Sequence, residues 1–391
     1  RVDCAVAAVH ASLVLRMPFP ALVARVRATE HTDKMSKSLL TPAVALLCGV
    51  SSISQAQAAE PARLNDQLVT ATRTVQTAQQ SLAAVTVFDR AQIELSQATS
   101  VPELLKKVPG VSFANNGGPG KNTSLFMRGS ESDHVLVLID GIKIGSVSSG
   151  GAALQDLPLE LIERIEVVRG PRSSLYGSEA VGGVIQIFTR KGNGTGAKPF
   201  FSAGVGTHDS YSGSAGITGG DGKGWYSLGL SGADTDGINV KSAATSGYED
   251  DADGYRNLSA VLSAGYRFDN GLELDANLLQ AKSHSDYDQV NRRRTSGFHA
   301  NSDGENRVFG TRARFAPLEP WLVTLQVGRR EDKSDAFQDG DFYSRFDSRR
   351  DSASWQNDLS LAPGHILTLG VDYQHDEVNG TTAYAEDSRD N

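Results

Sequence analysis

The chain of 391 residues is poor in cysteine and contains no long apolar run. Its two cysteines, Cys4 and Cys48, both stand within the first fifty positions. No stretch reaches the roughly 18 consecutive apolar residues of a membrane-spanning helix, an absence that a membrane β-barrel would share. Basic residues are not in excess either, since 38 Lys and Arg face 46 Asp and Glu, a net charge of -8. We therefore expect no nucleic-acid partner, because such proteins carry a basic surface.

Residues 35–58 have the pattern of a secretory signal peptide. A short basic start at Lys37 precedes the apolar stretch Leu39–Val50, and Ala56–Ala58 gives the small-x-small pattern of a cleavage site. A buried helix is the alternative interpretation. Residues 1–34 precede this start and are interpreted as an upstream, non-native segment. Cleavage would leave a chain without cysteine, which is compatible with export to an oxidising compartment.

Two regions of different character lie after the proposed cleavage site. Residues 59–83 form a polar leader with one β-prone stretch, which is available for strand addition to a partner protein or is simply a linker. Residues 84–191 alternate short apolar strands with helical turns, which predicts a small α+β domain. The strands are expected at Ala84–Phe88, Ser124–Arg128, His134–Ile139, Ile165–Arg169 and Val184–Thr189, the helix at Ser100–Val108 and a helical turn at Leu159–Glu163.

Residues 192–391 consist of segments that alternate apolar and polar residues between turns rich in Gly, Asp, Asn and Ser. Side chains alternate across a strand, so each segment has one apolar and one polar face. A soluble sandwich would show a similar alternation. Long strands, charged polar faces and aromatic residues near strand ends favour a membrane barrel. The clearest apolar faces are Leu258, Ala260, Leu262, Ala264, Tyr266 and Phe268 in one segment and Leu367, Leu369, Val371 and Tyr373 in another.

The most specific stretch is RIEVVRGPRSSLYGSEAVGGVIQI at Arg164–Ile187. It resembles the closing segment of the plug domain of TonB-dependent transporters, as do PELLKKVPGVSF at Pro102–Phe113 and FMRGSESDHVLVLIDG at Phe126–Gly141. The resemblance implies an all-β, antiparallel membrane barrel with an N-terminal α+β plug domain. Such a barrel has about 22 strands, so residues 192–391 are expected to supply only its N-terminal part, with an open edge and the C-terminal strands missing.

The family resemblance also implies a function. The protein would lie in the outer membrane of a Gram-negative bacterium as a monomeric barrel in lipid, and would import a ligand with energy delivered by TonB. It would not be an enzyme, and no nucleophile–base pair is found in the sequence. The leader motif DQLVTA resembles the segment through which the family pairs with TonB, the TonB box. Its residues are Asp66, Gln67, Leu68, Val69, Thr70 and Ala71.

The plug motifs most resemble the cobalamin transporters within this family, so cobalamin is the expected ligand. A siderophore or haem transporter, or less readily a passive pore or adhesin, remains an alternative. In the cobalamin branch two outward plug loops touch the ligand, and glycines there allow close approach of the backbone. The matching residues are Ser130, Glu131, Ser132, Asp133, His134, Ser146, Val147, Ser148, Ser149, Gly150, Gly151 and Leu154.

Calcium is the expected metal. Carboxylates cluster in the connection Asp234–Arg256, and another lies in Asp286–Glu305. Like charges at this density repel unless they are solvated or share a hard cation, and calcium takes six to eight oxygen ligands. Ordinary solvated loop acids are the alternative. The positions that match calcium ligands of the cobalamin branch are Asp251, Asp253, Tyr287, Asp288 and Asn239, where Asn239 replaces a charged ligand by a neutral one.

Overall fold

The computed structural model describes part of the leader and nearly all of the chain beyond it, and the described residues belong to one compact unit. They are Gln67–Leu68, Arg73, Gln76–Thr77, 82–192, 195–289, 299–362 and 365–391. The proposed signal peptide and four of the six TonB-box residues (Asp66, Val69, Thr70, Ala71) lie outside these ranges. Within these ranges, the helices are all too short or too polar to cross a membrane.

The α+β domain is built around a five-stranded sheet with the order β3-β8-β9-β6-β7. All of its neighbouring strands run antiparallel except β6 and β9, which are parallel. A two-stranded sheet, β4-β5, lies beside it. The strands are β3 (Ala84–Phe88), β4 (Val111–Asn115), β5 (Thr123–Met127), β6 (Val135–Ile139), β7 (Ile142–Lys143), β8 (Ile162–Arg169) and β9 (Gly183–Thr189).

Short helices connect these strands, and their caps are visible in the sequence. Asp89 caps α2 (Arg90–Ser96) by accepting from Gln92 N at 2.8 Å, while the Gln92 side chain accepts from Asp89 N, a reciprocal capping box. Ser100 caps α3 (Val101–Leu105). The expected helix Ser100–Val108 is thus shorter than predicted. The other helical segments are α4 (Ser173–Tyr176), η3 (Ser132–His134), η4 (Leu154–Asp156) and η5 (Leu159–Leu161).

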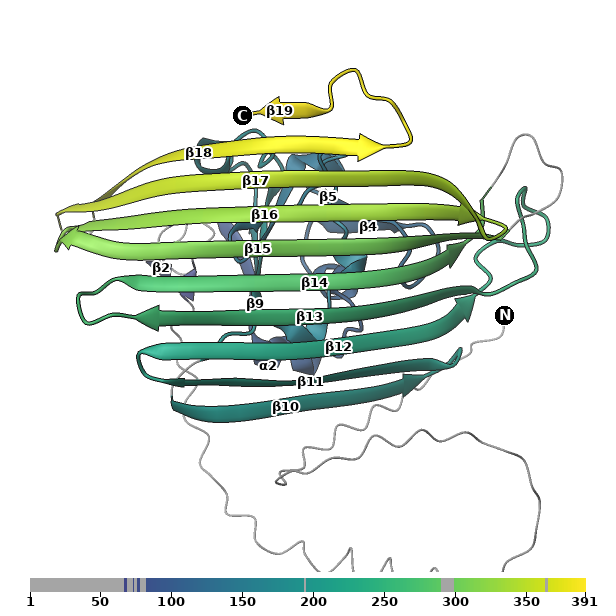
Figure 1. The fold of residues 1–391 in the computed structure, drawn as a ribbon, viewed down its shortest axis with the longest axis horizontal. Helices are drawn as coiled ribbons and strands as arrows, with labels where there is room; N and C mark the ends of the chain where they lie inside the picture. Colours follow the sequence, from purple (N-terminus) through teal and green to yellow (C-terminus); the bar gives the residue numbers. More distant parts are fainter. Residues whose placement is uncertain are drawn as a thin grey trace, which may run out of the picture. The chain divides into compact units, whose positions relative to one another are not determined.

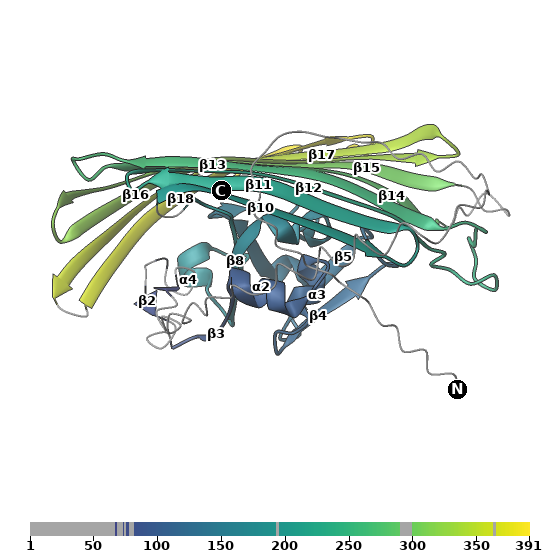
Figure 2. The ribbon, with the colours of Figure 1, turned by 90° about the horizontal axis from the view of Figure 1, so that it is seen from below.

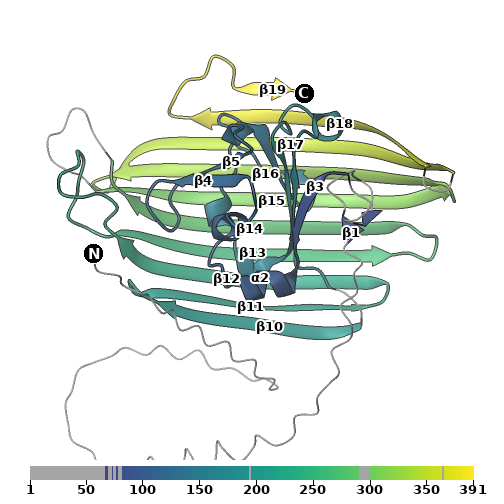
Figure 3. The same cartoon turned by 180° about the vertical axis from the view of Figure 1, so that it is seen from behind.

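Residues 195–391 form one antiparallel sheet in which each strand pairs with the next in sequence (Figures 1 and 3). The strands lengthen along the sheet, from 12 residues in β10 to 22 in β17. β10 and β19 stand at its two edges in the described structure, so the sheet is open. The strands are β10 (Thr195–Gly206), β11 (Ser210–Asp221), β12 (Gly224–Ile238), β13 (Asp253–Arg267), β14 (Glu273–Tyr287), β15 (Ala300–Leu318), β16 (Trp321–Gln338), β17 (Asp341–Ala362), β18 (His365–Gly380) and β19 (Ser388–Asp390).

The two faces of this sheet differ as the alternation predicted, and Figure 2 shows the sheet as a curved layer. On β13, Leu258 and Leu262 are 65% and 50% exposed, whereas Ser259 and Ser263 are 1% and 2% exposed. The apolar face is therefore the outer one, as a strand in lipid requires. This confirms the barrel-type fold predicted from the sequence.

The connections between the strands are shorter than the sequence suggested. The expected loop Asp234–Arg256 shrinks to residues 239–252, because Asp234 and Arg256 pair across β12 and β13 and join side chains at 2.5 Å. The expected loop Asp286–Glu305 begins only after Tyr287 and ends before Ala300. Polar residues at the strand ends resemble a loop in sequence, but cross-strand charge pairs let them continue the sheet.

Candidate functional site

The two plug loops expected to touch ligand lie against each other. Gly150 has φ +68°, and a Cβ built there would stand 2.4 Å from the Cβ of Asp133. The 146–151 loop closes on itself, since Ser146 N donates to Gly151 O at 2.8 Å and Gly150 N donates to Ser146 O at 2.9 Å. Glu131, Asp133, His134, Ser148 and Ser149 are exposed, and Ser130, Ser132, Val147, Gly150 and Gly151 are partly so.

Two members of the predicted set are not exposed. Leu154 is fully buried and belongs to the hydrophobic core of the plug, because η4 turns its side chain inward among leucines and isoleucines. Its assignment as a ligand contact is wrong on this ground. Ser146 is 9% exposed, and its hydroxyl lies 3.3 Å from Ser148 Oγ. Its side chain and backbone thus make contacts within the loop itself.

The predicted calcium ligands gather at one end of strands β12 to β14. Asp253 is the first residue of β13 rather than a loop residue, and its Oδ2 accepts from Val240 N at 2.9 Å. Asn239 donates to Glu249 O and accepts from Lys241 N, so its amide closes the loop. Both oxygens of Asp288 and Oδ1 of Asp251 are buried without a hydrogen-bond partner. Unpartnered carboxylate oxygens are what a bound cation would satisfy.

A histidine that sequence reasoning missed completes this acidic cluster. His299 Nδ1 lies 3.2 Å from Asp251 Oδ2 and 3.6 Å from Glu249 Oε1. One ligand atom from each of these three residues falls within 4.8 Å of the others. A neighbouring open hollow of about 490 Å³ is lined in part by Asn239, Tyr248 and Asp250. His299 stands alone at the far end of the 288–299 connection, so no spacing pattern marked it.

Burial raises the pKa values of two carboxyl groups in the outer loops. The pKa of Asp288 lies above its usual value because the group is buried; attraction to Lys241 opposes this shift and repulsion from Asp251 adds to it. Burial also raises the pKa of Glu249, which His299 partly offsets. A divalent cation among these groups would favour their charged forms.

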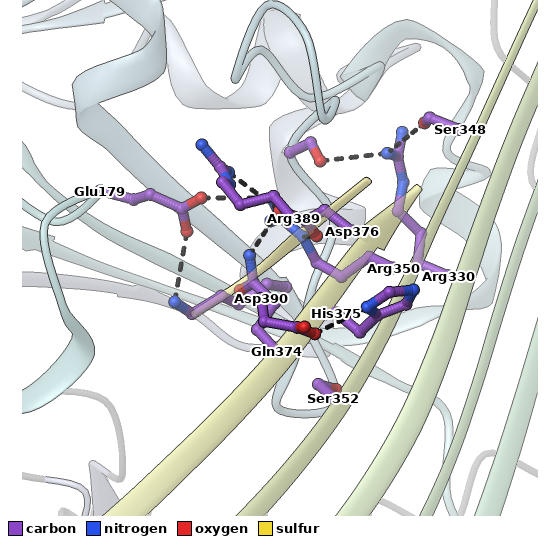
Figure 4. A network of polar contacts seen from close by, with 12 residues as sticks. Glu179, Arg330, Ser348, Arg350, Ser352, Gln374, His375, Asp376, Arg389 and Asp390 are labelled. Atoms are coloured by element: carbon purple, nitrogen blue, oxygen red, sulfur yellow. Dashed lines mark hydrogen bonds and ion pairs between the residues drawn. The ribbon is translucent and has the colours of Figure 1, made fainter. Parts of the chain in front are cut away.

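A second polar cluster joins the plug to the inner face of the sheet (Figure 4). Arg350 on β17 is 2% exposed and lies 2.7 Å from Asp376 and 3.3 Å from Glu179 of the plug. Glu179 also meets Lys143, at 3.3 Å. Arg330 on β16 donates to the backbone oxygen of Gly145 at 3.0 Å. Glu179 belongs to the motif YGSEAVGG, so part of that motif holds the plug against the sheet.

The leader contributes a small hairpin and one anchored side chain. Strand β1 (Gln67–Leu68), within the predicted TonB box, pairs antiparallel with β2 (Gln76–Thr77). Between them Arg73 lies 3.0 Å from Asp372 Oδ2 of β18 and stacks over the ring of Tyr176, 4.5 Å from its centroid. The box residues in the described structure thus occur as a strand, in a conformation that strand pairing with a partner would use.

Comparison with known proteins assigns the architecture. Residues 77–184 match the family model of the TonB-dependent receptor plug domain. The chain is 34% identical over 360 residues to the vitamin B12 transporter BtuB of Photobacterium profundum, covering 91% of this chain and 57% of that protein. It is 35% identical over 363 residues to BtuB of Vibrio cholerae, covering 91% and 58%. The chain therefore spans little more than half the length of these relatives.

Solved structures agree on the fold. The ferric enterobactin receptor PfeA of Pseudomonas aeruginosa superposes with a TM-score of 0.62 at 19% identity, covering 80% of this chain and 51% of that one. The FrpB iron transporter of Neisseria meningitidis gives a TM-score of 0.64 at 14% identity, covering 76% and 49%. At these identities the likeness concerns the fold alone.

Proposed function

Because this chain is a TonB-dependent receptor, we propose that its plug and barrel strands serve to import cobalamin across the bacterial outer membrane with energy from TonB. The observation that carries the ligand assignment is the 34–35% identity to vitamin B12 transporters over 91% of the chain. Its relatives are outer-membrane transporters rather than enzymes, in agreement with the sequence.

The plug loops support this proposal. Ligand would rest on the exposed residues of 131–134 and 148–151, where Gly150 and Gly151 leave the backbone open to a bulky molecule. The buried contacts of Arg330 and Arg350 tie the 143–146 and 179 segments to the barrel wall, so ligand would meet a floor of fixed shape.

Calcium in the outer loops is part of the same proposal. Asp251, Asp253 and Asp288 would supply oxygens, with Glu249 and His299 at the margin of the site and Tyr287 and Asn239 beside it. Support comes from the unpartnered oxygens of Asp251 and Asp288. The bound ion would relieve their repulsion and order the loops above the plug.

Titration calorimetry with cyanocobalamin tests the ligand assignment, using the complete transporter in detergent with and without calcium. Tight binding that weakens on chelation is the expected result. If cyanocobalamin does not bind in either condition, the ligand is an iron chelate or another scarce nutrient, and the cobalamin proposal is wrong.

The TonB mechanism has its own test. Leu68→Pro removes a backbone donor within β1, so uptake should stop while binding at the cell surface persists. Leu68→Ala is the matched control, because it keeps the N–H group and should retain most uptake. Normal uptake by the proline variant would rule out strand pairing with TonB through this segment.

A further inference from the structure

The plug loop between β4 and β5 is held in shape by one side chain. Asn115 Oδ1 accepts from Gly117 N at 2.9 Å and from Gly118 N at 2.6 Å. Its amide nitrogen donates to Thr123 Oγ1 at 2.8 Å and to Gly118 O at 3.1 Å. Since these bonds are all internal, the loop keeps its form without help from the barrel, and whatever it touches meets a preformed surface.

Lys121, at the end of this loop, inserts into the barrel wall. The side chain is 3% exposed. Its ammonium donates to the backbone oxygens of Asp253 and Gly254, at 3.1 and 3.0 Å, and to Ser285 Oγ at 3.1 Å. A buried ammonium is costly unless its donors are satisfied, and these three acceptors from β13 and β14 do so.

Two glycines bring the backbone of the plug loop into close contact with the barrel wall. A Cβ at Gly120 would lie 1.8 Å from the ring of Tyr255, and a Cβ at Gly117 would lie 2.6 Å from Val240. Both glycines also have positive φ, +69° and +132°. The plug loop therefore fits against the start of β13 and the start of the outer loop, residues 239–252, with no room for a side chain at Gly117 or Gly120.

Asp253 connects the two loops through different atoms. Its backbone oxygen accepts from Lys121 of the plug, while its carboxylate accepts from Val240 N and so closes the outer loop. We propose that Lys121 is a positioning residue that couples the plug loop 116–121 to the acidic outer loop 239–252, so that the outer loop is ordered only when the plug loop is in place.

This role differs from that of a lysine supplying charge alone. As a charge near Asp253 and Asp286, Lys121 would repel a cation in the outer loop, and its removal would strengthen cation binding. As a positioning residue it holds the start of β13 in place, and its removal would weaken cation binding despite the lost repulsion. The two roles thus predict opposite signs.

Hydrogen exchange of the complete transporter tests the coupling without any ligand. In Lys121→Met the amides of 239–252 should exchange on the order of tenfold faster, because a hydrogen-bonded charge is lost. Amides of the plug strand β6 should keep their wild-type rates. Ser285→Ala removes a single acceptor and should give a smaller change in the same loop. Lys106→Met, an exposed plug lysine, is the matched control and should change neither.

Two results would overturn the proposal. One is an outer loop that exchanges at the wild-type rate in Lys121→Met. The other is equal acceleration in β6 and the outer loop, which would mean that the lysine merely stabilises the plug. Ser285→Ala decides the matter if Lys121→Met fails to fold, since unchanged exchange there also contradicts the coupling.

Calcium titration shows whether the loss of Lys121 weakens or strengthens calcium binding. This test rests on the calcium part of the proposed function. With calcium alone as probe, the affinity of Lys121→Met should fall several-fold below wild type, and a rise would show a role through charge only. If the wild-type protein binds no calcium, the calcium proposal fails, while hydrogen exchange still decides whether the loops are coupled.

Discussion

The plug buries its apolar side chains, whereas the sheet exposes its apolar side chains and buries polar ones. In the plug, Leu104 and Ile165 are fully buried, and all five residues of β6 are buried. In the sheet, Leu258 and Val371 are 65% and 66% exposed, while serines and paired charges line the inner face. The plug follows the rule for a domain in water and the sheet the rule for a strand between lipid and a polar interior. Alternation alone therefore predicts a strand, and its surroundings decide which face is buried.

A charge placed at the centre of each apolar region should have the largest effect, and a different one in the plug and in the sheet. Leu104→Asp puts an unpaired carboxylate into the plug core and should unfold the plug, which protease digestion of the plug would reveal. Leu262→Arg places a charge on the outer face of β13 and should cost about 2–4 kcal/mol of stability in lipid while the plug stays folded. Equal damage to the plug from both variants would contradict the separation between a buried plug core and a lipid-facing sheet surface.

Ion pairs on the two faces of the sheet should differ in how much they stabilise the protein. Arg350→Met leaves Asp376 and Glu179 without their common partner and should cost about 3–5 kcal/mol in unfolding free energy. Arg329→Met breaks an outer pair with Asp351, at 2.6 Å, and should cost less than about 1 kcal/mol because Arg329 is half-exposed and Asp351 is partly exposed. Urea unfolding in detergent measures both. Similar losses would mean that the inner network is as solvated as the outer one.

The boundary between plug and sheet contains a carboxyl group that responds to pH. Burial raises the pKa of Asp156 to about 6, although the Tyr255 hydroxyl, which donates to it at 2.9 Å, opposes the shift. Because the folded protein favours the neutral form, stability from this group is full at low pH and is lost as pH rises through about 6. Asp156→Asn should therefore exceed wild type in stability at pH 8, by about 1–3 kcal/mol, and match it at pH 4. Unfolding midpoints at both values test this, and a pH-independent difference would contradict it.

The smallest expected effect concerns the leader. Arg73→Met removes the partly exposed ion pair with Asp372 and the stacking over the buried ring of Tyr176, at a cost of about 1 kcal/mol. The leader hairpin should be cleaved by protease about five-fold faster as a result. Lys198→Met, an exposed lysine of β10, is the control and should leave the rate unchanged. Unaltered cleavage in Arg73→Met would show that the hairpin is held elsewhere.

Sequence reasoning predicted the strands of the plug well and its helices poorly. Ala84–Phe88 is a strand with the expected bounds, because its β-branched and aromatic residues favour no alternative. The helix at Arg90–Ser96 was missed although Asp89 and Gln92 form a capping box, since it is short and presents one buried residue, Ile93. Strand β4 lies in a stretch that the sequence marks only as the end of a motif.

The candidate site was predictable only in part, because its residues come from distant segments. Clustered acids such as Asp251 and Asp253 were visible as neighbours in the chain, whereas His299 approaches them only through the pairing of β13, β14 and β15. Leu154 shared a motif with exposed residues but not their orientation. No motif in the sequence pointed to Lys121, because its insertion between β13 and β14 depends on tertiary packing.

The unequal lengths of the strands make one rim of the sheet uneven. At about 3.3 Å per residue, β10 measures about 40 Å along its axis and β17 about 70 Å. The ends next to the acidic outer loop are in register from β12 to β17, since Ile238 pairs with Asp253, Tyr287 with Ala300, and Gln338 with both Ala300 and Asp341. The longer strands therefore gain their extra residues at the opposite end of the sheet. The rim that carries the acidic outer loop is even along these strands, and the uneven rim lies on the far side.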